Sequence, residues 1–447
     1  MLKSHSQTMV WPAVINPRSA QVFAYLTQIE RSQWYRPEHL RQLQAMQLAS
    51  RLRHAARHSA FFAPKLAGIQ IDRHNAFDVL SSLPLLTRAD MQSHAAGIHC
   101  PSPEDHGVVK TLRTSGSTGQ PVEVRCTGAC LGLRAAFTIR NLGWRSMDLR
   151  KTFAAIRASV KTGTAEKPVH YRGWGSHLSM LFHTGKALGL PIQVPVTEQL
   201  EFLERFSPAY LLTYPSNLRA LLDQSPTKPS SLECVVSIGE TLHADVADDV
   251  RGKWGIPVYD DYSSEELGPI ASQCQHGNFH CSAESLIVEV IDDEGRPCAP
   301  GQVGRVVVTD MANFASAMLR YEIRDYAEVG EPCGCRRSLP TLKRIVGRER
   351  NMMVLPGGER FWPQFGMRSD EALALVRQYQ VIQTSPDHLD LKIVAARPLS
   401  QADRDWLATT IRKSTGHPFD IAIEQVEGEL PKGANGKLQT FICQVSP

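Results

Sequence analysis

The sequence has little of what membrane proteins and nucleic-acid-binding proteins depend on. No uninterrupted run of about 18 apolar residues occurs in its 447 residues, so no transmembrane helix is expected. The amino terminus also lacks the apolar run of a signal peptide, so we expect a cytoplasmic protein. Its 49 Lys and Arg residues against 45 Asp and Glu leave a net charge of +4 without any dense basic block, and we expect no nucleic-acid partner.

Ten cysteines are present, and in a cytoplasmic protein they are expected to be thiols or metal ligands rather than disulfides. Some of them lie close to histidines, an arrangement that is typical of tetrahedral zinc sites. The candidate ligands are Cys274, His276, His280 and Cys281, followed further along the chain by Cys333 and Cys335. The residues alone leave open which of these six would bind a metal.

The hydrophobic pattern predicts an α/β protein without internal repeats. Apolar residues recur every three or four positions over residues 18–70, which predicts helices. Helical stretches alternate with short apolar runs from 130 to 255, as in a parallel α/β layer, and hairpins follow after about residue 283. The pattern then changes again, and we expect a large domain over 1–346 and a small α+β domain over 347–447.

The segment TSGSTGQP, which begins at Thr114, is rich in glycine and hydroxyl side chains and lies between two predicted strands. Such a loop offers main-chain N–H groups and hydroxyl donors with little bulk, and it can bind phosphate oxygens. The pattern G-x-x-x-x-G-K-[ST] of the Walker-type loop is absent. An ordinary hairpin loop has a similar composition, so the segment by itself leaves both interpretations open.

Four further segments follow TSGSTGQP along the chain: YDDYSSEELGPIA, LRYEIRDYAEVG, IVGRERNMM and LPKGANGKLQT. In this order the five segments resemble the motifs of the adenylate-forming superfamily, which contains acyl-CoA synthetases and adenylation domains. The segments HAARHSAFFAPKL and LLTYPSNL and the short chain are similar to its phenylacetate–CoA ligase-like branch. The resemblance implies a large N-terminal adenylate-forming domain with mixed sheets and helices, and a small mobile α+β C-terminal domain.

The resemblance also implies which residues bind ATP. Those implied to contact the nucleotide are Thr114, Ser115, Gly116, Ser117, Thr118 and Gly119 at the phosphates, Asp325 at the ribose, and Tyr262, Gly239 and Glu240 at the adenine. Hydroxyl and main-chain donors suit the phosphate oxygens, and a carboxylate suits the ribose hydroxyl groups.

Further roles follow from the same resemblance. Glu266 is implied to hold Mg²⁺, which prefers oxygen ligands. Lys437 is implied to stabilise the charge that develops during adenylation, and Arg348 to form part of the hinge between the domains. Tyr214 and Pro215 are implied to lie near the acid.

Some members of the branch carry a zinc ion, and the matching positions here are Cys274, His280, Cys333 and Cys335. His276 and Cys281 are competing ligands. Because four protein ligands leave no open coordination position, such a zinc ion would be structural.

The reaction implied is the ATP- and Mg²⁺-dependent adenylation of a small carboxylic acid, aryl or otherwise apolar, and transfer of its acyl group to coenzyme A. Alternatives are a carrier-protein or amine acceptor, adenylylation of a deazaflavin coenzyme, and a nucleotide-binding scaffold with weakened catalysis. The scaffold alternative arises from two departures from the family pattern. Gln120 stands where the family usually has lysine, and Arg350 lies where the hinge often has an acidic residue.

Overall fold

The chain divides into two compact units, Met1–Ile345 and Val346–Pro447. The computed structural model describes residues 2–113, 121–363, 365, 367, 372, 375–428, 430 and 440–445. The predicted domain boundary after residue 346 lies one residue beyond the observed division. Among the described residues, no helix combines the length and the apolar character that crossing a membrane requires.

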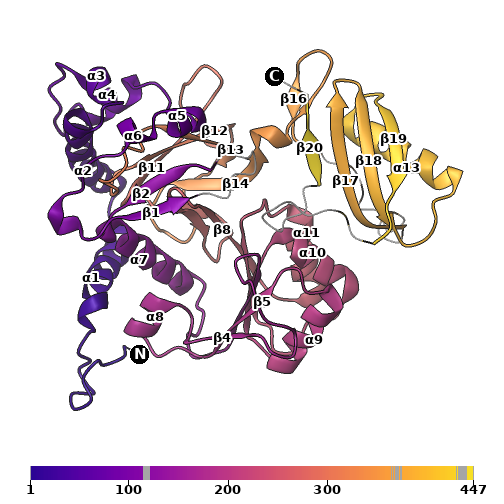
Figure 1. Cartoon of the computed structure of the whole chain (residues 1–447), viewed down its shortest axis with the longest axis horizontal. Coiled ribbons are helices and arrows are strands. Elements are labelled where there is room, and N and C mark those ends of the chain that lie inside the picture. Colours follow the sequence, from indigo (N-terminus) through magenta and orange to yellow (C-terminus); the bar gives the residue numbers. More distant parts are fainter. Residues whose placement is uncertain are drawn as a thin grey trace. The chain divides into compact units, whose positions relative to one another are not determined.

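A twelve-stranded mixed sheet runs through the first unit (Figure 1). In spatial order its strands are β11 (Leu286–Ile291), β12 (Val303–Asp310), β13 (Tyr321–Val329), β14 (Thr341–Arg348), β10 (Phe279–Cys281), β9 (Gly268–Gln273), β8 (Val258–Ser264), β7 (Cys234–Ile238), β6 (Tyr210–Thr213), β3 (Phe153–Arg157), β5 (Ala187–Pro191) and β4 (Val169–Tyr171). The strands from β8 to β5 are parallel, and β8 pairs antiparallel with β9. The predicted parallel and antiparallel regions therefore belong to one sheet.

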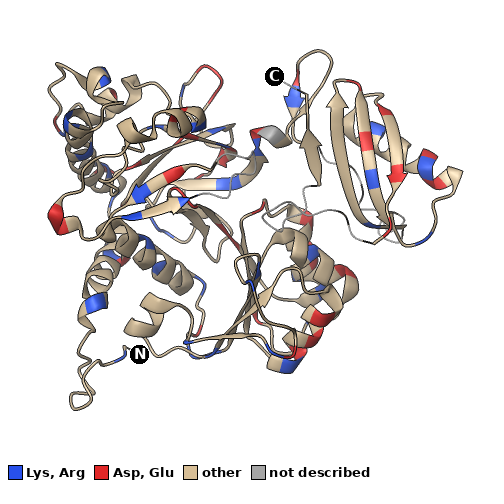
Figure 2. Ribbon diagram, in the orientation of Figure 1, with Lys and Arg blue, Asp and Glu red and all other residues tan. Residues whose placement is uncertain are grey.

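Helices form the crossovers between the parallel strands, as such strands require. They are α9 (Val196–Phe206), α10 (Pro215–Gln224), α11 (Ala244–Asp249) and the π-helical turn η2 (Val250–Trp254). Buried leucines such as Leu203 and Leu218 face the sheet residue Leu211 in one apolar cluster. Figure 2 shows acidic and basic residues interspersed on the outer surface of these helices, where Arg219 pairs with Asp223.

The amino-terminal part is helical, as the sequence predicts. Its helices are α1 (Pro17–Ser32), α2 (Pro37–His58), α3 (Ala63–Leu66), α4 (Ala76–Ser82), α5 (Arg88–Ser93), α6 (Ala95–Ile98) and the 3₁₀ turn η1 (Glu104–His106). A two-stranded antiparallel sheet follows, made of β1 (Lys110–Arg113) and β2 (Glu123–Cys126). It leads into α7 (Gly128–Trp144), which packs against α1, and the short helix α8 (Ser176–Leu181) contacts α1 as well.

The second unit is a small α+β domain, as predicted. Its four-stranded sheet has the order β19 (Asp420–Gln425), β18 (His388–Ala395), β17 (Val376–Ser385) and β20 (Phe441–Cys443). Among the described residues, the other elements of this unit are the 3₁₀ turn η3 (Glu349–Asn351), the hairpin of β15 (Met353–Val354) and β16 (Arg360–Phe361), and the helix α13 (Gln401–Thr415). A capping box between Ser400 and Asp403 begins α13, and its buried residues Leu407 and Ile411 pack against Leu391 and Ile393 of β18.

Two leucines of α2 test how much the first unit depends on this helix. Leu52 is fully buried, whereas Leu43 is 40% exposed. We expect Leu52→Ala to lower the free energy of unfolding by about 3 kcal/mol, because it leaves a cavity in the core. Leu43→Ala, the matched control, should change it by less than about 0.5 kcal/mol. Urea unfolding followed by circular dichroism measures both, and equal losses would contradict the packing described for α2.

Candidate active site

Several of the predicted site residues lie at one edge of the sheet, where the parallel strands end. Tyr214 directly follows β6, Gly239 and Glu240 follow β7, and Tyr262 lies on β8. Because β6, β7 and β8 are parallel, their carboxyl ends meet at the same edge, which is where ligands bind in open α/β sheets. Gly239 has a φ of +73°, a conformation that favours glycine and allows the chain to turn sharply after β7.

Segments that follow neighbouring strands hold two of these side chains in place. The Glu240 carboxylate accepts hydrogen bonds from the main-chain N of Ser216 at 2.9 Å and from its Oγ at 3.0 Å. The Tyr214 hydroxyl accepts a hydrogen bond from the main-chain N of Ala158 at 3.1 Å. Burial raises the pKa of Tyr214, so the phenol stays protonated at neutral pH. Ser216 is not among the residues that the sequence motifs indicate, although a serine in the first turn of a helix is a frequent hydrogen-bond donor.

The structure brings Tyr262 and Asp325 together. The Tyr262 hydroxyl donates a hydrogen bond to Oδ2 of Asp325 at 2.8 Å, and both residues are buried. Tyr262 lies on β8 and Asp325 on β13, and three strands lie between these two in the order of the sheet. The sheet must therefore curve strongly for its two parts to meet here. Two residues that were predicted from separate motifs thus lie in one place.

Glu266 lies just after β8 and is buried beside an arginine that no motif in the sequence indicates. The distance between Nη1 of Arg88 and Oε1 of Glu266 is 3.6 Å. Arg88 is the first residue of α5, where a capping box between Thr87 and Asp90 begins the helix. That pattern indicates in the sequence that a helix begins here. It does not indicate that Arg88 contacts Glu266, which lies 178 residues further along the chain.

Tyr321 on β13 completes this group. Burial raises the pKa of the Tyr321 hydroxyl, the Glu266 carboxylate raises it further, and Arg88 opposes the rise. The region beside Glu266 therefore contains a neutral phenol, a carboxylate and a guanidinium group. Such a set has hydrogen-bond donors for phosphate and oxygen ligands for a divalent cation.

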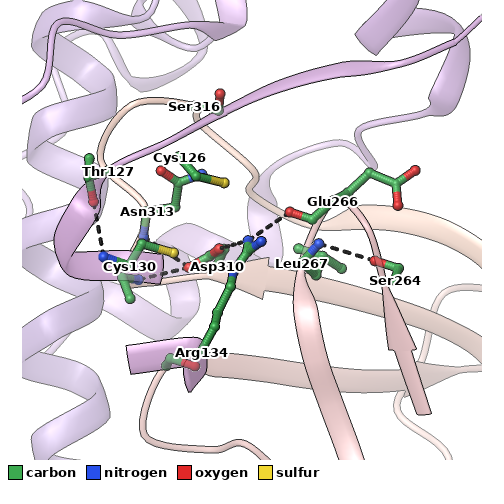
Figure 3. A network of polar contacts seen from close by, with 12 residues as sticks. Cys126, Thr127, Cys130, Arg134, Ser264, Glu266, Leu267, Asp310, Asn313 and Ser316 are labelled. Atoms are coloured by element: carbon green, nitrogen blue, oxygen red, sulfur yellow. Dashed lines mark hydrogen bonds and ion pairs between the residues drawn. The ribbon is translucent and has the colours of Figure 1, made fainter. Parts of the chain in front are cut away.

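The main chain of Glu266 is also held in place, as Figure 3 shows. Nη2 of Arg134, on α7, donates a hydrogen bond to the Glu266 carbonyl at 2.7 Å and lies 3.4 Å from Oδ2 of Asp310. One residue further on, the main-chain N of Leu267 donates to Oγ of Ser264 at 3.1 Å. The turn after β8 is thus attached both to the strand itself and to α7.

A second site lies away from this edge. The ligand atoms of Cys274, His280, Cys333 and Cys335 all lie within 4.8 Å of one another. The two sulfur atoms of Cys274 and Cys333 are 3.7 Å apart, and Sγ of Cys335 is 3.2 Å from Nε2 of His280. Burial lowers the pKa of His280 to about 4, so the imidazole is neutral, the form that binds metals. Three thiols and one imidazole are a donor set that suits zinc.

The competing ligands do not join this group. Among the described residues, the group contains neither His276 nor Cys281. Cys281 is buried elsewhere, and burial raises the pKa of its thiol to about 12. The structure therefore brings four of the six candidates together.

Some of the predicted residues lie outside the described part of the chain, and two others are described. Those outside the described residues are Thr114, Ser115, Gly116, Ser117, Thr118, Gly119, Gln120 and Lys437. Pro215 is described, and it begins α10 directly after Tyr214. Arg348 ends β14 and belongs to the second unit, where its carbonyl accepts a hydrogen bond from Nε1 of Trp362 at 3.2 Å.

Comparisons with known proteins show which family the chain belongs to. The model of the AMP-binding enzyme family matches residues 78–316, more than half of the chain. The phenylacetate-coenzyme A ligase of Thermus thermophilus is 24% identical over 452 residues, covering 91% of this chain and 96% of the relative. The enzyme of the same name from Escherichia coli is 24% identical over 373 residues, covering 79% and 81%.

Solved structures show the same fold. A 2-hydroxyisobutyryl-CoA ligase, crystallised in the postadenylation state in complex with 2-HIB-AMP, aligns with a TM-score of 0.70 at 18% identity. The alignment covers 90% of this chain and 89% of that chain. The chain therefore belongs to the AMP-binding family of adenylate-forming enzymes, and its sequence is similar to phenylacetate–CoA ligases.

Proposed function

We propose that this protein is an AMP-forming acid–thiol ligase. In the first step the oxygen of a carboxylate attacks the α-phosphorus of ATP, which yields an acyl-adenylate and releases pyrophosphate. In the second step the thiol of coenzyme A attacks the acyl carbon, and AMP leaves. The observation that carries the proposal is the contact of Tyr262 with Asp325 at the carboxyl edge of the sheet, in a chain of the AMP-binding family.

The nucleoside end of ATP would lie against this pair. A carboxylate has two oxygens that can each accept more than one hydrogen bond, so the bond from Tyr262 is compatible with bonds from both ribose hydroxyls to Asp325. The ring of Tyr262 would lie against the adenine, and the turn at Gly239 and Glu240 would border it. Since both members of the pair are buried, they would bind the nucleoside without losing much further side-chain freedom.

The phosphate end would lie near Glu266. Its carboxylate would hold Mg²⁺, which prefers oxygen ligands and would reduce the charge of the phosphates. Arg88 places a guanidinium group beside Glu266, and such a group binds phosphate oxygens well. This positive charge is relevant because the glycine- and serine-rich segment carries Gln120 where the family usually has lysine.

The acid would lie near Tyr214 and Pro215. An aryl or otherwise apolar acid is favoured, because two relatives that match over most of the chain are phenylacetate-coenzyme A ligases. Lys437 would stabilise the charge that develops as the acyl-adenylate forms. Arg348 would act at the hinge, and residues 347–447 would move as a lid. A cytoplasmic location stays a prediction.

We also propose that Cys274, His280, Cys333 and Cys335 hold a structural zinc ion. Cys274 directly follows β9 and His280 lies on β10, whereas the other two lie between β13 and β14. A zinc ion would cross-link these segments. It would have no catalytic role, because four protein ligands leave no open coordination position on the metal.

Two other functions are candidates. One is an adenylating enzyme with a carrier-protein or amine acceptor, and the other is a nucleotide-binding scaffold with weakened catalysis. The observation that favours a weakened scaffold is the absence of lysine at position 120. Binding of ATP without pyrophosphate exchange for any acid would support it.

Exchange of labelled pyrophosphate into ATP, measured over a panel of aryl and fatty acids, tests the first step. We expect at least one acid to support exchange, and Lys437→Ala to reduce it by about 100-fold or more, because a donor to the developing charge is lost. Lys413→Ala is the control, since Lys413 is an exposed lysine of the same unit. Exchange retained by Lys437→Ala would remove the lysine from its proposed role.

Metal analysis tests the zinc site. Protein purified without chelators should contain about one equivalent of zinc. Cys335→Ser should lose most of it, whereas Cys298→Ser should keep it, because Cys298 lies outside the ligand group. Wild-type protein with less than about a tenth of an equivalent would contradict the proposal.

A further inference from the structure

Arg134 is a largely buried arginine that none of the proposed steps uses. It lies on α7, its side chain is 12% exposed, and Nη2 contacts both the Glu266 carbonyl and the Asp310 carboxylate. Burial lowers the pKa of Arg134, but Cys130 and Asp310 outweigh this effect and raise it, so the guanidinium remains charged. A charged group in this position needs its partners, because an unpaired buried charge is costly.

The same side chain passes over Gly268, two residues after Glu266. A Cβ atom at Gly268 would lie 2.6 Å from Cδ of Arg134, closer than two carbon atoms can approach, and Gly268 has a φ of +73°. Glycine therefore allows Arg134 to lie directly on this turn. Arg134 thus contacts the turn at its Glu266 carbonyl and again at Gly268.

Asp310 carries the connection further. It ends β12 and is buried, and its Oδ1 accepts hydrogen bonds from the main-chain N atoms of Ala312 and Asn313 at 2.9 and 3.0 Å. Nδ2 of Asn313 then donates to the carbonyl of Arg125 at 2.9 Å. One carboxylate therefore links Arg134 to the turn after β12 and, through that turn, to β2.

Ser316 strengthens the attachment to β2. Its hydroxyl accepts a hydrogen bond from the main-chain N of Arg125 at 3.0 Å and donates to the carbonyl of Arg125 at 3.1 Å. In the sequence, β2 follows the residues that are proposed to hold the ATP phosphates, Thr114 to Gly119, with Gln120, Pro121 and Val122 between them. The turn after β12 is thus attached to the strand that leaves the proposed phosphate-binding segment.

We propose that Arg134 is a positioning residue that fixes the main chain of Glu266 relative to β2, so that the Glu266 carboxylate is held in place for Mg·ATP. Figure 3 shows that the main-chain carbonyl of Glu266 points toward Arg134, whereas the carboxylate of Glu266 points away from the Arg134 guanidinium. Arg134 therefore acts on the main chain and leaves the carboxylate available to a cation. The inference rests on the proposed role of Glu266 as the Mg²⁺ ligand.

Arg134→Met tests this, with Arg140→Met as the matched control. Arg140 lies on the same helix, is fully buried, and likewise contacts one carboxylate, that of Glu284, and one main-chain carbonyl, that of Ile29. In pyrophosphate exchange we expect Arg134→Met to raise the KM for Mg·ATP by about tenfold or more while the KM for the acid changes by less than about twofold. Arg140→Met should leave the ratio of the two KM values unchanged. Arg134→Lys, which keeps one donor, should give an intermediate KM for Mg·ATP.

Binding of Mg²⁺ with α,β-methylene-ATP, measured by calorimetry, separates this inference from the proposed function. If the wild type binds this analogue but no acid supports exchange, the proposed function fails. The inference about Arg134 can still be tested in that case, because it predicts that Arg134→Met binds the analogue about tenfold more weakly than Arg140→Met does. Equal binding by the two variants overturns the inference, and so does a wild type that binds no analogue. Thermal unfolding shows whether each variant is folded. If Arg134→Met is not folded, binding of the analogue by Arg134→Lys is compared with binding by Arg140→Met instead.

Discussion

A continuous ladder of main-chain hydrogen bonds from β11 to β4 determines where the candidate nucleotide-binding residues lie. Its parallel strands end at one edge, and this places Tyr214, Gly239, Glu240 and Tyr262 there. The curvature of the sheet then brings Asp325 on β13 to Tyr262 on β8. A hydrogen bond between side chains of such distant strands is possible only because the strands between them hold a fixed register and twist.

Helix α7 is attached to the rest of the first unit by three arginines. Arg134 contacts Asp310, Arg140 contacts Glu284, and Arg145, at the end of the helix, contacts Asp261 on β8. Buried ion pairs of this kind add little net stability, because burial of the charges offsets their attraction. They do restrict how the helix can lie, since any shift would leave a buried charge without its partner. In this protein the restricted elements include the turn that carries Glu266.

The cysteine and histidine cluster lies in a region with a second set of long-range polar contacts. Oε1 of Gln33, just after α1, accepts hydrogen bonds from Nε1 of Trp144 at 2.8 Å and from Nε of Arg337 at 2.9 Å. The ring of Trp144 also packs edge-on against His280, with 5.5 Å between the ring centroids. The amino-terminal helices, the end of α7 and the segment before β14 therefore meet beside the cluster, where a zinc ion would strengthen an existing junction.

The sequence by itself determined the fold class, the order of the elements and the family. These depend on local information: the run PAYLLTYPSNLRALLDQ forms β6 and α10 because its apolar spacing changes from that of a strand to that of a helix, and each family motif is a short contiguous segment. Tertiary structure decided which side chains meet. His280 and Cys281 are neighbours on β10, and because successive side chains of a strand point to opposite faces, only His280 joins Cys333 and Cys335. Arg88 and Arg134 reach Glu266 from helices that are more than a hundred residues distant in the chain, and no local pattern encodes a contact that exists only once the sheet has formed.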